Sequence, residues 1–265
     1  MQIGYLISDL NQLEEVAAWG YDYAEALPWL IDPDFLRPEA AISAATQAAL
    51  QRIRTSPVPV TTLCGFMPEP EANGLMVVGP DVNRERLRAY TTRIFDHMQA
   101  LGIDVIGYGS GASRWSPPGF DHTRALEQVA EFLQMCDELG RPRGVRVALE
   151  PYNRDDANLL NTVAEARKLV QSVNRPHVML MADFFHMQLN GEAMAELLPA
   201  GPYLIHAHIA EPGRGRPQST PADHYHFLQT LRRAGYDGRV TQTGDLPAYA
   251  SPAEAATALK QAARE

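Results

Sequence analysis

The stretch that decides the fold spans residues 145–183 and reads VRVALEPYNRDDANLLNTVAEARKLVQSVNRPHVMLMAD. Two short runs rich in apolar and β-branched residues, 145–150 and 177–183, flank a helical pattern at 161–174. Parallel strands need a crossover connection of this kind, so the stretch predicts a strand–helix–strand unit in one parallel sheet. Both strands end in a carboxylate, and a buried charge of this kind needs a partner.

The same alternation repeats along the chain of 265 residues. We predict strands at 2–7, 21–27, 58–66, 104–110, 145–150, 177–183, 203–211 and 239–245. Helical patterns separate them at 11–19, 35–54, 81–101, 121–140, 161–174, 191–198, 221–235 and 252–264. Eight such units predict a single domain, residues 1–265, with the (β/α)8 (TIM) barrel fold. The alternative is an open doubly wound sheet, which usually has fewer strands, and no glycine-rich phosphate loop follows any predicted strand.

The composition narrows the range of functions. The formal net charge is −9 and the pI is about 5.4, which argues against electrostatic binding to nucleic acid. The N-terminus has no basic segment followed by an apolar run, and no stretch of about 18 apolar residues occurs, so neither a signal peptide nor a membrane span is expected. Cys64 and Cys136 lie far apart, which does not suit a disulfide framework and favours a reducing, cytoplasmic setting.

The barrel prediction also places the active site, because TIM barrel enzymes build it at the C-terminal ends of the strands. The predicted strand ends carry six side chains that bind metals or protons: Glu25, Cys64, Glu150, Asp183, His208 and Glu211. Glu150, Asp183 and His208 come from three successive strands and form a donor set that suits Mn²⁺, Mg²⁺, Co²⁺ or Zn²⁺. Other interpretations are a salt bridge from Glu150 to Arg154, a helix N-cap at Asp183 and a buried structural histidine at 208.

Three further polar side chains lie close to these in the sequence. His186 follows Asp183 by three residues. His206 and His208 are two residues apart on one strand, so both point to the same side of it, and we interpret His206 as a buried structural residue. Arg214 lies in a loop rich in Gly and Pro, where it either holds a substrate oxygen or is a solvated charge.

Several segments together resemble a known family, the xylose-isomerase-like barrels of the sugar phosphate isomerase/epimerase group. Within that group the chain is most similar to the D-tagatose and D-psicose 3-epimerases. The segments that carry the resemblance are LEPYNR (149–154), LLNT (159–162), DFFHM (183–187) and HAHIAEPGRGRP (206–217), with lesser matches at AEALP (24–28) and LCGF (63–66). The resemblance implies a TIM barrel enzyme that binds a divalent metal, often Mn²⁺, through two glutamates, an aspartate and a histidine.

The resemblance also implies roles for single residues. Glu150, Asp183 and His208 match three of the four metal ligands. Substrate contacts are implied for four residues: His186 and Arg214 near the transferred proton, Asp156 where the family usually has a glutamate, and Glu25 near the far end of the sugar. Cys64 is a further candidate for a substrate contact, because it lies at a predicted strand end. Trp115, in the Gly-, Ser- and Pro-rich segment 109–121, is a further candidate for the pocket wall, in a loop that forms either a lid or plain surface.

The chain departs from the family pattern at the last strand. That strand of the family carries the second glutamate, which is both ligand and base, whereas here the segment reads YDGRVTQTGDL (236–246) and has no glutamate. Direct alignment places Thr243 at this position, and a shift of one residue places Gln242 there. Asp245 could reach the site from the loop.

The functional prediction is a metal-dependent isomerase or epimerase that removes a proton next to a carbonyl group of a small sugar, keto-sugar or polyol. Because an epimerase needs two bases, the missing glutamate leaves a lyase or dehydratase open, acting on a keto-sugar, keto-inositol or 3-keto-glycoside with Glu150 as the single base. A degenerate sugar-binding protein is the alternative outside enzymes. We expect a small carbohydrate-like ligand, no nucleic acid or membrane partner, and Mn²⁺ as the metal. Homo-oligomerisation is left open.

Overall fold

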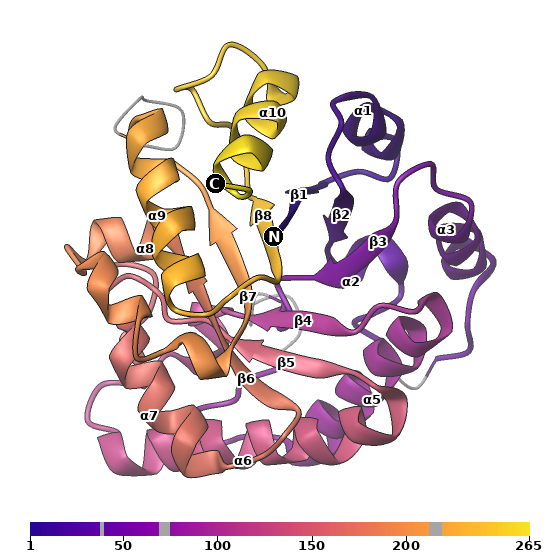
Figure 1. Ribbon diagram of the computed structural model, residues 1–265. Coiled ribbons are helices and arrows are strands. Elements are labelled where there is room, and N and C mark those ends of the chain that lie inside the picture. The colour runs from indigo at the N-terminus through magenta and orange to yellow at the C-terminus, as the bar shows by residue number, and fades with distance from the viewer. Residues whose placement is uncertain (38–39, 69–74, 212–218) are drawn as a thin grey trace.

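Eight parallel strands close into a barrel in the order β1 to β8, which confirms the predicted (β/α)8 fold. The computed structural model describes residues 1–37, 40–68, 75–211 and 219–265. Figure 1 shows the strands at the centre with helices around them. The strands are β1 (Gln2–Leu6), β2 (Tyr23–Ala26), β3 (Val60–Leu63), β4 (Val105–Tyr108), β5 (Arg146–Leu149), β6 (Val178–Asp183), β7 (Leu204–Ile209) and β8 (Arg239–Gln242).

The helices follow the strands along the chain. They are α1 (Gln12–Ala18), α2 (Pro28–Ile31), α3 (Ala44–Arg54), α5 (Arg84–Leu101), α6 (His122–Gly140), α7 (Val163–Val173), α8 (Phe184–Leu189), α9 (Pro221–Arg233) and α10 (Pro252–Ala262). Side-chain caps start several of them: α7 begins with a capping box between Thr162 and Glu165, in which each side chain accepts a backbone N–H of the other. Within the described ranges, no helix is both long and apolar enough to cross a bilayer.

Two predicted helices have different boundaries in the structure. The pattern at 35–54 is helical only from Ala44, where Ser43 provides the N-cap. The helix predicted at 191–198 is absent apart from a 3₁₀ turn at Met194–Leu197, and α8 instead begins directly after β6. The Asp183 carboxylate caps α8 by accepting the N–H of Phe185 at 2.7 Å, so the strand passes into the helix without a loop.

The main apolar core lies between the barrel and the helices, whereas the barrel interior is partly polar. Val105, Ala148 and Met181 form a small apolar cluster of their own, separate from the main core. The Tyr23 ring packs against Gly4, where a Cβ atom would approach it to 2.3 Å, so residue 4 has to be glycine.

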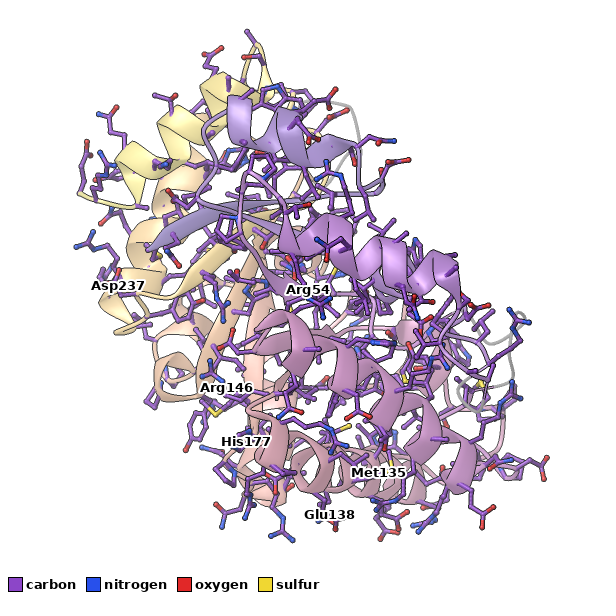
Figure 2. All side chains as sticks on the ribbon, turned by 90° about the vertical axis from the view of Figure 1, so that its right-hand side faces the viewer. Arg54, Met135, Glu138, Arg146, His177 and Asp237 are labelled. Atoms are coloured by element: carbon purple, nitrogen blue, oxygen red, sulfur yellow. The ribbon has the colours of Figure 1, made fainter. Side chains whose placement is uncertain are left out.

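The N-terminal ends of the strands are closed by ion pairs. Asp104 accepts from Arg146 on β5 and from Arg239 on β8, each at 2.6 Å. Figure 2 shows Arg146 near His177, which immediately precedes β6, on the same side of the molecule. In TIM barrels the N-terminal face stabilises the fold, and the active site lies at the C-terminal ends of the strands.

Candidate active site

Three of the predicted metal ligands converge at the C-terminal end of the barrel. Nδ1 of His208 lies 3.6 Å from Oε1 of Glu150 and 3.8 Å from Oδ2 of Asp183. One donor atom from each side chain lies within 4.8 Å of the other two. All three residues are buried. They come from the C-terminal ends of β5, β6 and β7, where TIM barrels build their active sites.

This group lines a cavity of about 540 Å³, a volume typical of small-molecule sites. Its described lining residues sit at or just after strand ends: Leu6, Leu27, Cys64, Gly65, Glu150, Tyr152, Asp183, Phe185, His186, His208, Ala210, Glu211, Thr243, Gly244 and Asp245. The predicted site residues Cys64, His186 and Thr243 therefore share the cavity with the three candidate ligands.

Electrostatics favours a cation among these residues. Burial is the main reason why the pKa of the Asp183 carboxyl is raised, and the nearby Glu150 charge adds to the rise. Burial would also raise the pKa of Glu150, but interactions with His208, His186 and Arg114 together lower it. Two buried carboxylates beside one imidazole suit a divalent ion, because the ion offsets their repulsion and accepts mixed O and N donors.

His186 presents an N–H group to the cavity. Its Nδ1 accepts from the backbone N–H of Asn153 at 3.1 Å and from Nδ2 of the same residue at 2.8 Å. Both partners can only donate, so the proton of the neutral ring is on Nε2. Nε2 lies 4.0 Å from Oε1 of Glu150 and 3.9 Å from Oδ2 of Asp183. The Tyr152 ring stacks on His186 with centroids 4.1 Å apart, which holds the imidazole in this orientation.

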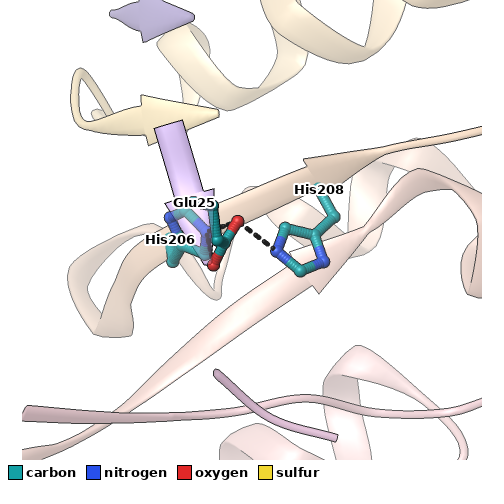
Figure 3. A group of neighbouring side chains, drawn as sticks. All are labelled: Glu25, His206 and His208. Atoms are coloured by element: carbon teal, nitrogen blue, oxygen red, sulfur yellow. Dashed lines mark hydrogen bonds and ion pairs between the residues drawn. The ribbon is translucent and has the colours of Figure 1, made fainter. Parts of the chain in front are cut away.

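Glu25 lies in a position that does not fit the predicted contact with substrate. It is 0% exposed and is not among the described residues that line the cavity. Its carboxylate instead accepts from Nε2 of His208 at 3.0 Å and lies 3.1 Å from Nε2 of His206. Figure 3 shows Glu25 beside both histidines, with its carboxylate joined to His208. His206 is buried, as we expected from its position on the strand.

Two further predicted substrate contacts lie outside the cavity wall. Trp115 is 40% exposed, and neither it nor Asp156 is among the described lining residues. Asp156 instead accepts from Nδ2 of Asn153 at 2.7 Å, and Asn153 in turn donates to His186. Among the described residues, Asn153 therefore links Asp156 to His186. Arg214 lies outside the described residues.

The register of β8 decides between Gln242 and Thr243. Gln242 is buried on the outer face, where it accepts from the Tyr21 hydroxyl at 2.6 Å. Thr243 lines the cavity, and Asp245 does so as well. Successive side chains of a strand point to opposite faces, so Thr243 follows the inward-facing Thr241 on the cavity side. Direct alignment, with Thr243 in place of the family's second glutamate, agrees with this geometry.

Arg114 and Gly109 are site residues that the sequence prediction missed. The Arg114 side chain is fully buried and donates to the carbonyl oxygens of Tyr108 at 3.2 Å and Glu150 at 2.7 Å. Its guanidinium lies 5.3 Å from the centre of the Tyr152 ring. A Cβ atom on Gly109 would approach Oε2 of Glu150 to 2.3 Å. The GSG sequence at 109–111 was the one sequence signal for such close packing, and no sequence signal distinguished Arg114 from a surface arginine.

Removing the Arg114 guanidinium should destabilise the fold. We expect Arg114→Met to lower the free energy of unfolding by more than about 2 kcal/mol, because two buried carbonyl groups lose their donor. Urea unfolding at neutral pH measures the change. The matched control is Arg88→Met, which removes an exposed arginine paired with Glu138 and should cost less than about 1 kcal/mol. Equal losses in the two variants would mean that Arg114 does not support the strand end.

Comparisons with known proteins agree with this architecture. Residues 13–260 match the family model described as xylose isomerase-like TIM barrel. A 3-dehydro-D-guloside 4-epimerase from Escherichia coli (strain K12) is 28% identical over 218 residues, covering 77% of this chain and 78% of that protein. A D-psicose 3-epimerase from Ruminiclostridium cellulolyticum is 30% identical over 193 residues, covering 68% of this chain and 62% of that protein.

Solved structures show the same fold. The apo crystal structure of 3-keto-D-glucoside 4-epimerase from E. coli superposes with a TM-score of 0.74 at 24% identity, covering 99% of this chain and 98% of that one. The D-psicose 3-epimerase with D-tagatose from Clostridium cellulolyticum H10 gives 0.75 at 20% identity, covering 100% and 96%. The named relatives confirm the predicted class, an enzyme of the sugar isomerase and epimerase type. The chain belongs to the xylose isomerase-like TIM barrel family.

Proposed function

We propose that this chain is a divalent-metal-dependent enzyme that removes a proton next to a carbonyl group of a small keto-sugar or keto-glycoside. The observation that carries the proposal is the convergence of Glu150, Asp183 and His208 in one cavity at the barrel mouth, with donor atoms within 4.8 Å of one another. We propose Mn²⁺ as the metal, with Mg²⁺, Co²⁺ and Zn²⁺ as alternatives that suit the same donors.

The proposed roles follow from the positions of the side chains. A bound metal ion would polarise the substrate carbonyl and stabilise the negative charge that develops on its oxygen when the neighbouring carbon loses a proton. We propose Glu150 as the base, because its lowered pKa keeps the carboxylate ionised and able to accept a proton, and because it lines the cavity. His186 directs its Nε2–H toward the same space, where it can donate to a substrate oxygen.

Which product forms depends on whether a second acid in the cavity can return a proton to the substrate carbon. An epimerase returns a proton from the other face of the carbon and needs a second acid there. The neutral Thr243 immediately follows β8, but Asp245 and Glu211 also line the cavity. We therefore propose isomerase or epimerase activity first, with Asp245 as the second acid. Cleavage of a keto-glycoside is the second candidate, and the neutral side chain at 243 favours it.

The relatives suggest the substrate class. One is named for a 3-dehydro-D-guloside, a glycoside with an oxidised carbon, and others are named for D-psicose and L-ribulose, which are free ketoses. All of these sugars carry a carbonyl group beside a carbon with a hydroxyl and a removable proton. We propose that this shared feature is what the cavity recognises.

Solvent exchange tests the proposal without assuming a product. Chelator-treated protein and the same protein reloaded with Mn²⁺ are incubated in deuterated water with D-psicose or with methyl 3-keto-glucoside. After removal of the metal, proton NMR should reveal deuterium next to the carbonyl only in the reloaded sample. An epimer identifies the first candidate and released methanol the second. No exchange and no product with either substrate, across all four metals, would contradict the proposal and favour a binding protein.

A further inference from the structure

The geometry points to Glu25 as a positioning residue that fixes the tautomer of His208, so that Nδ1 of this histidine faces the metal site as a ligand. The inference rests on the proposed function, and it gives Glu25 a role that differs from the predicted contact with substrate. Glu25 comes from β2 and His208 from β7, so the contact crosses the barrel interior.

The hydrogen bonds of the Glu25 carboxylate leave one arrangement of protons. Oε2 lies 3.0 Å from Nε2 of His208, and the carboxylate lies 3.1 and 3.2 Å from Nε2 of His206. An ionised carboxylate can only accept, so both histidines donate Nε2–H. A metal-binding His208 then has its lone pair on Nδ1, the atom that faces Glu150 and Asp183. A carboxylate partner of this kind also makes the ligand nitrogen more basic.

His206 gives the carboxylate a second donor and holds it in place. His206 is fully buried, and within the described part of the chain its Nδ1 has no hydrogen-bond partner. An imidazolium there would leave an N–H unsatisfied in the core, so a neutral ring that donates from Nε2 is favoured. Its Nε2 also lies 3.4 Å from the Thr241 hydroxyl, which contacts the Tyr23 hydroxyl at 2.8 Å. The carboxylate is therefore fixed from both sides.

Burial distinguishes this role from substrate binding. Both Glu25 and His206 are 0% exposed, in a barrel layer that branched apolar side chains usually fill. Burying a carboxylate is costly unless it is ionically paired or hydrogen-bonded, and here its described partners are the two histidines. Of these two described partners, His208 is the one that also lines the cavity. Glu25 and His206 therefore act on the site through His208.

Metal binding by variants of Glu25 tests the inference directly. Co²⁺ is titrated into chelator-treated protein and followed by its visible absorption, which reports the ligands as well as the affinity. We expect Glu25→Gln to weaken Co²⁺ binding about 10- to 100-fold and to change the spectrum, because the amide cannot accept from both histidines. Glu25→Asp, which keeps the charge, should recover part of the affinity.

The control is Thr62→Val, a nearly isosteric change in the strand residue that pairs with Glu25. Thr62 is fully buried, and its hydroxyl has no hydrogen-bond partner among the described residues. This variant should bind Co²⁺ within about twofold of the unmodified protein, since it leaves His208 untouched. A Glu25→Gln protein that stays folded and binds Co²⁺ as tightly as Thr62→Val would overturn the inference.

A measurement on the unmodified protein keeps the inference testable if the Glu25 variants fail to fold. In Zn²⁺-loaded protein with ¹⁵N-labelled histidine, NMR should show His208 protonated at Nε2 and metal-bound at Nδ1. The reverse assignment would overturn the inference, and so would two bound metal ions, because the second would occupy the group formed by Glu25, His206 and His208. If the unmodified protein binds no metal at all, the proposed function itself fails.

Discussion

Glu150→Gln is expected to lower the turnover number by about 10²- to 10⁴-fold, the range that loss of a general base typically costs. The amide keeps an oxygen that can contact the metal, but it cannot accept a proton. Metal affinity should therefore fall much less than turnover. The measurement pairs the rate of deuterium exchange into D-psicose or methyl 3-keto-glucoside with Mn²⁺ affinity from calorimetric titration.

The control for this variant is Asp155→Asn, the same change from acid to amide on an exposed residue of the loop that follows β5. It should leave both turnover and metal affinity nearly unchanged. If Glu150→Gln keeps the activity of the control, another residue is the base. If it loses metal and turnover to the same extent, Glu150 acts as a ligand and the base lies elsewhere.

Thr243→Glu is expected to tighten Mn²⁺ binding at least about tenfold, because an added anionic ligand strengthens the attraction to a hard dication. Thr243 lines the cavity directly after β8, the strand that pairs with the one bearing His208. A carboxylate there also adds an acid to the wall of the cavity that Glu150 lines. The ratio of epimer formed to deuterium exchanged should therefore rise in this variant.

Thr243→Gln separates the effect of charge from that of size, because glutamine is as long as glutamate but carries no charge. It should neither tighten Mn²⁺ binding nor raise the yield of epimer. Equal gains in both variants would show that space, and not charge, limits the site. Rapid epimerisation by the unmodified protein would identify Asp245 or Glu211, the other acids of the described lining, as the second acid.

The candidate ligands at the strand ends were predictable from the sequence, because active sites of TIM barrels lie at the C-terminal ends of the strands. Short apolar runs ending in Glu150 and Asp183, with His208 on the next strand, were enough to bring three donors together once the barrel was assumed. The register of the last strand was open, because Gln242 and Thr243 are both polar. The structure resolves it through the bond from Tyr21 to Gln242, a partner far away in the sequence.

Contacts across the barrel could not be predicted from the sequence, because they join residues that lie far apart in the chain. The bond from Glu25 to His208 joins residues 183 positions apart, and no local pattern indicates it. An acid at a strand end could face either the cavity or the layer beneath it, and the structure places Glu25 in the buried layer, outside the described cavity lining. Arg114 lies in a loop where charged residues are usually solvated, so its burial against Tyr152 follows only from the packing of two loops.

The central claim is tested most directly by anomalous diffraction from crystals of the protein soaked in Mn²⁺. The account predicts one strong peak per chain, within about 2.0–2.6 Å of Glu150, Asp183 and Nδ1 of His208, the distances usual for such ligands. Asp183→Asn crystals soaked in the same way should show a weaker peak. No peak between these residues, or a main peak at Glu25 and His206, would contradict the account.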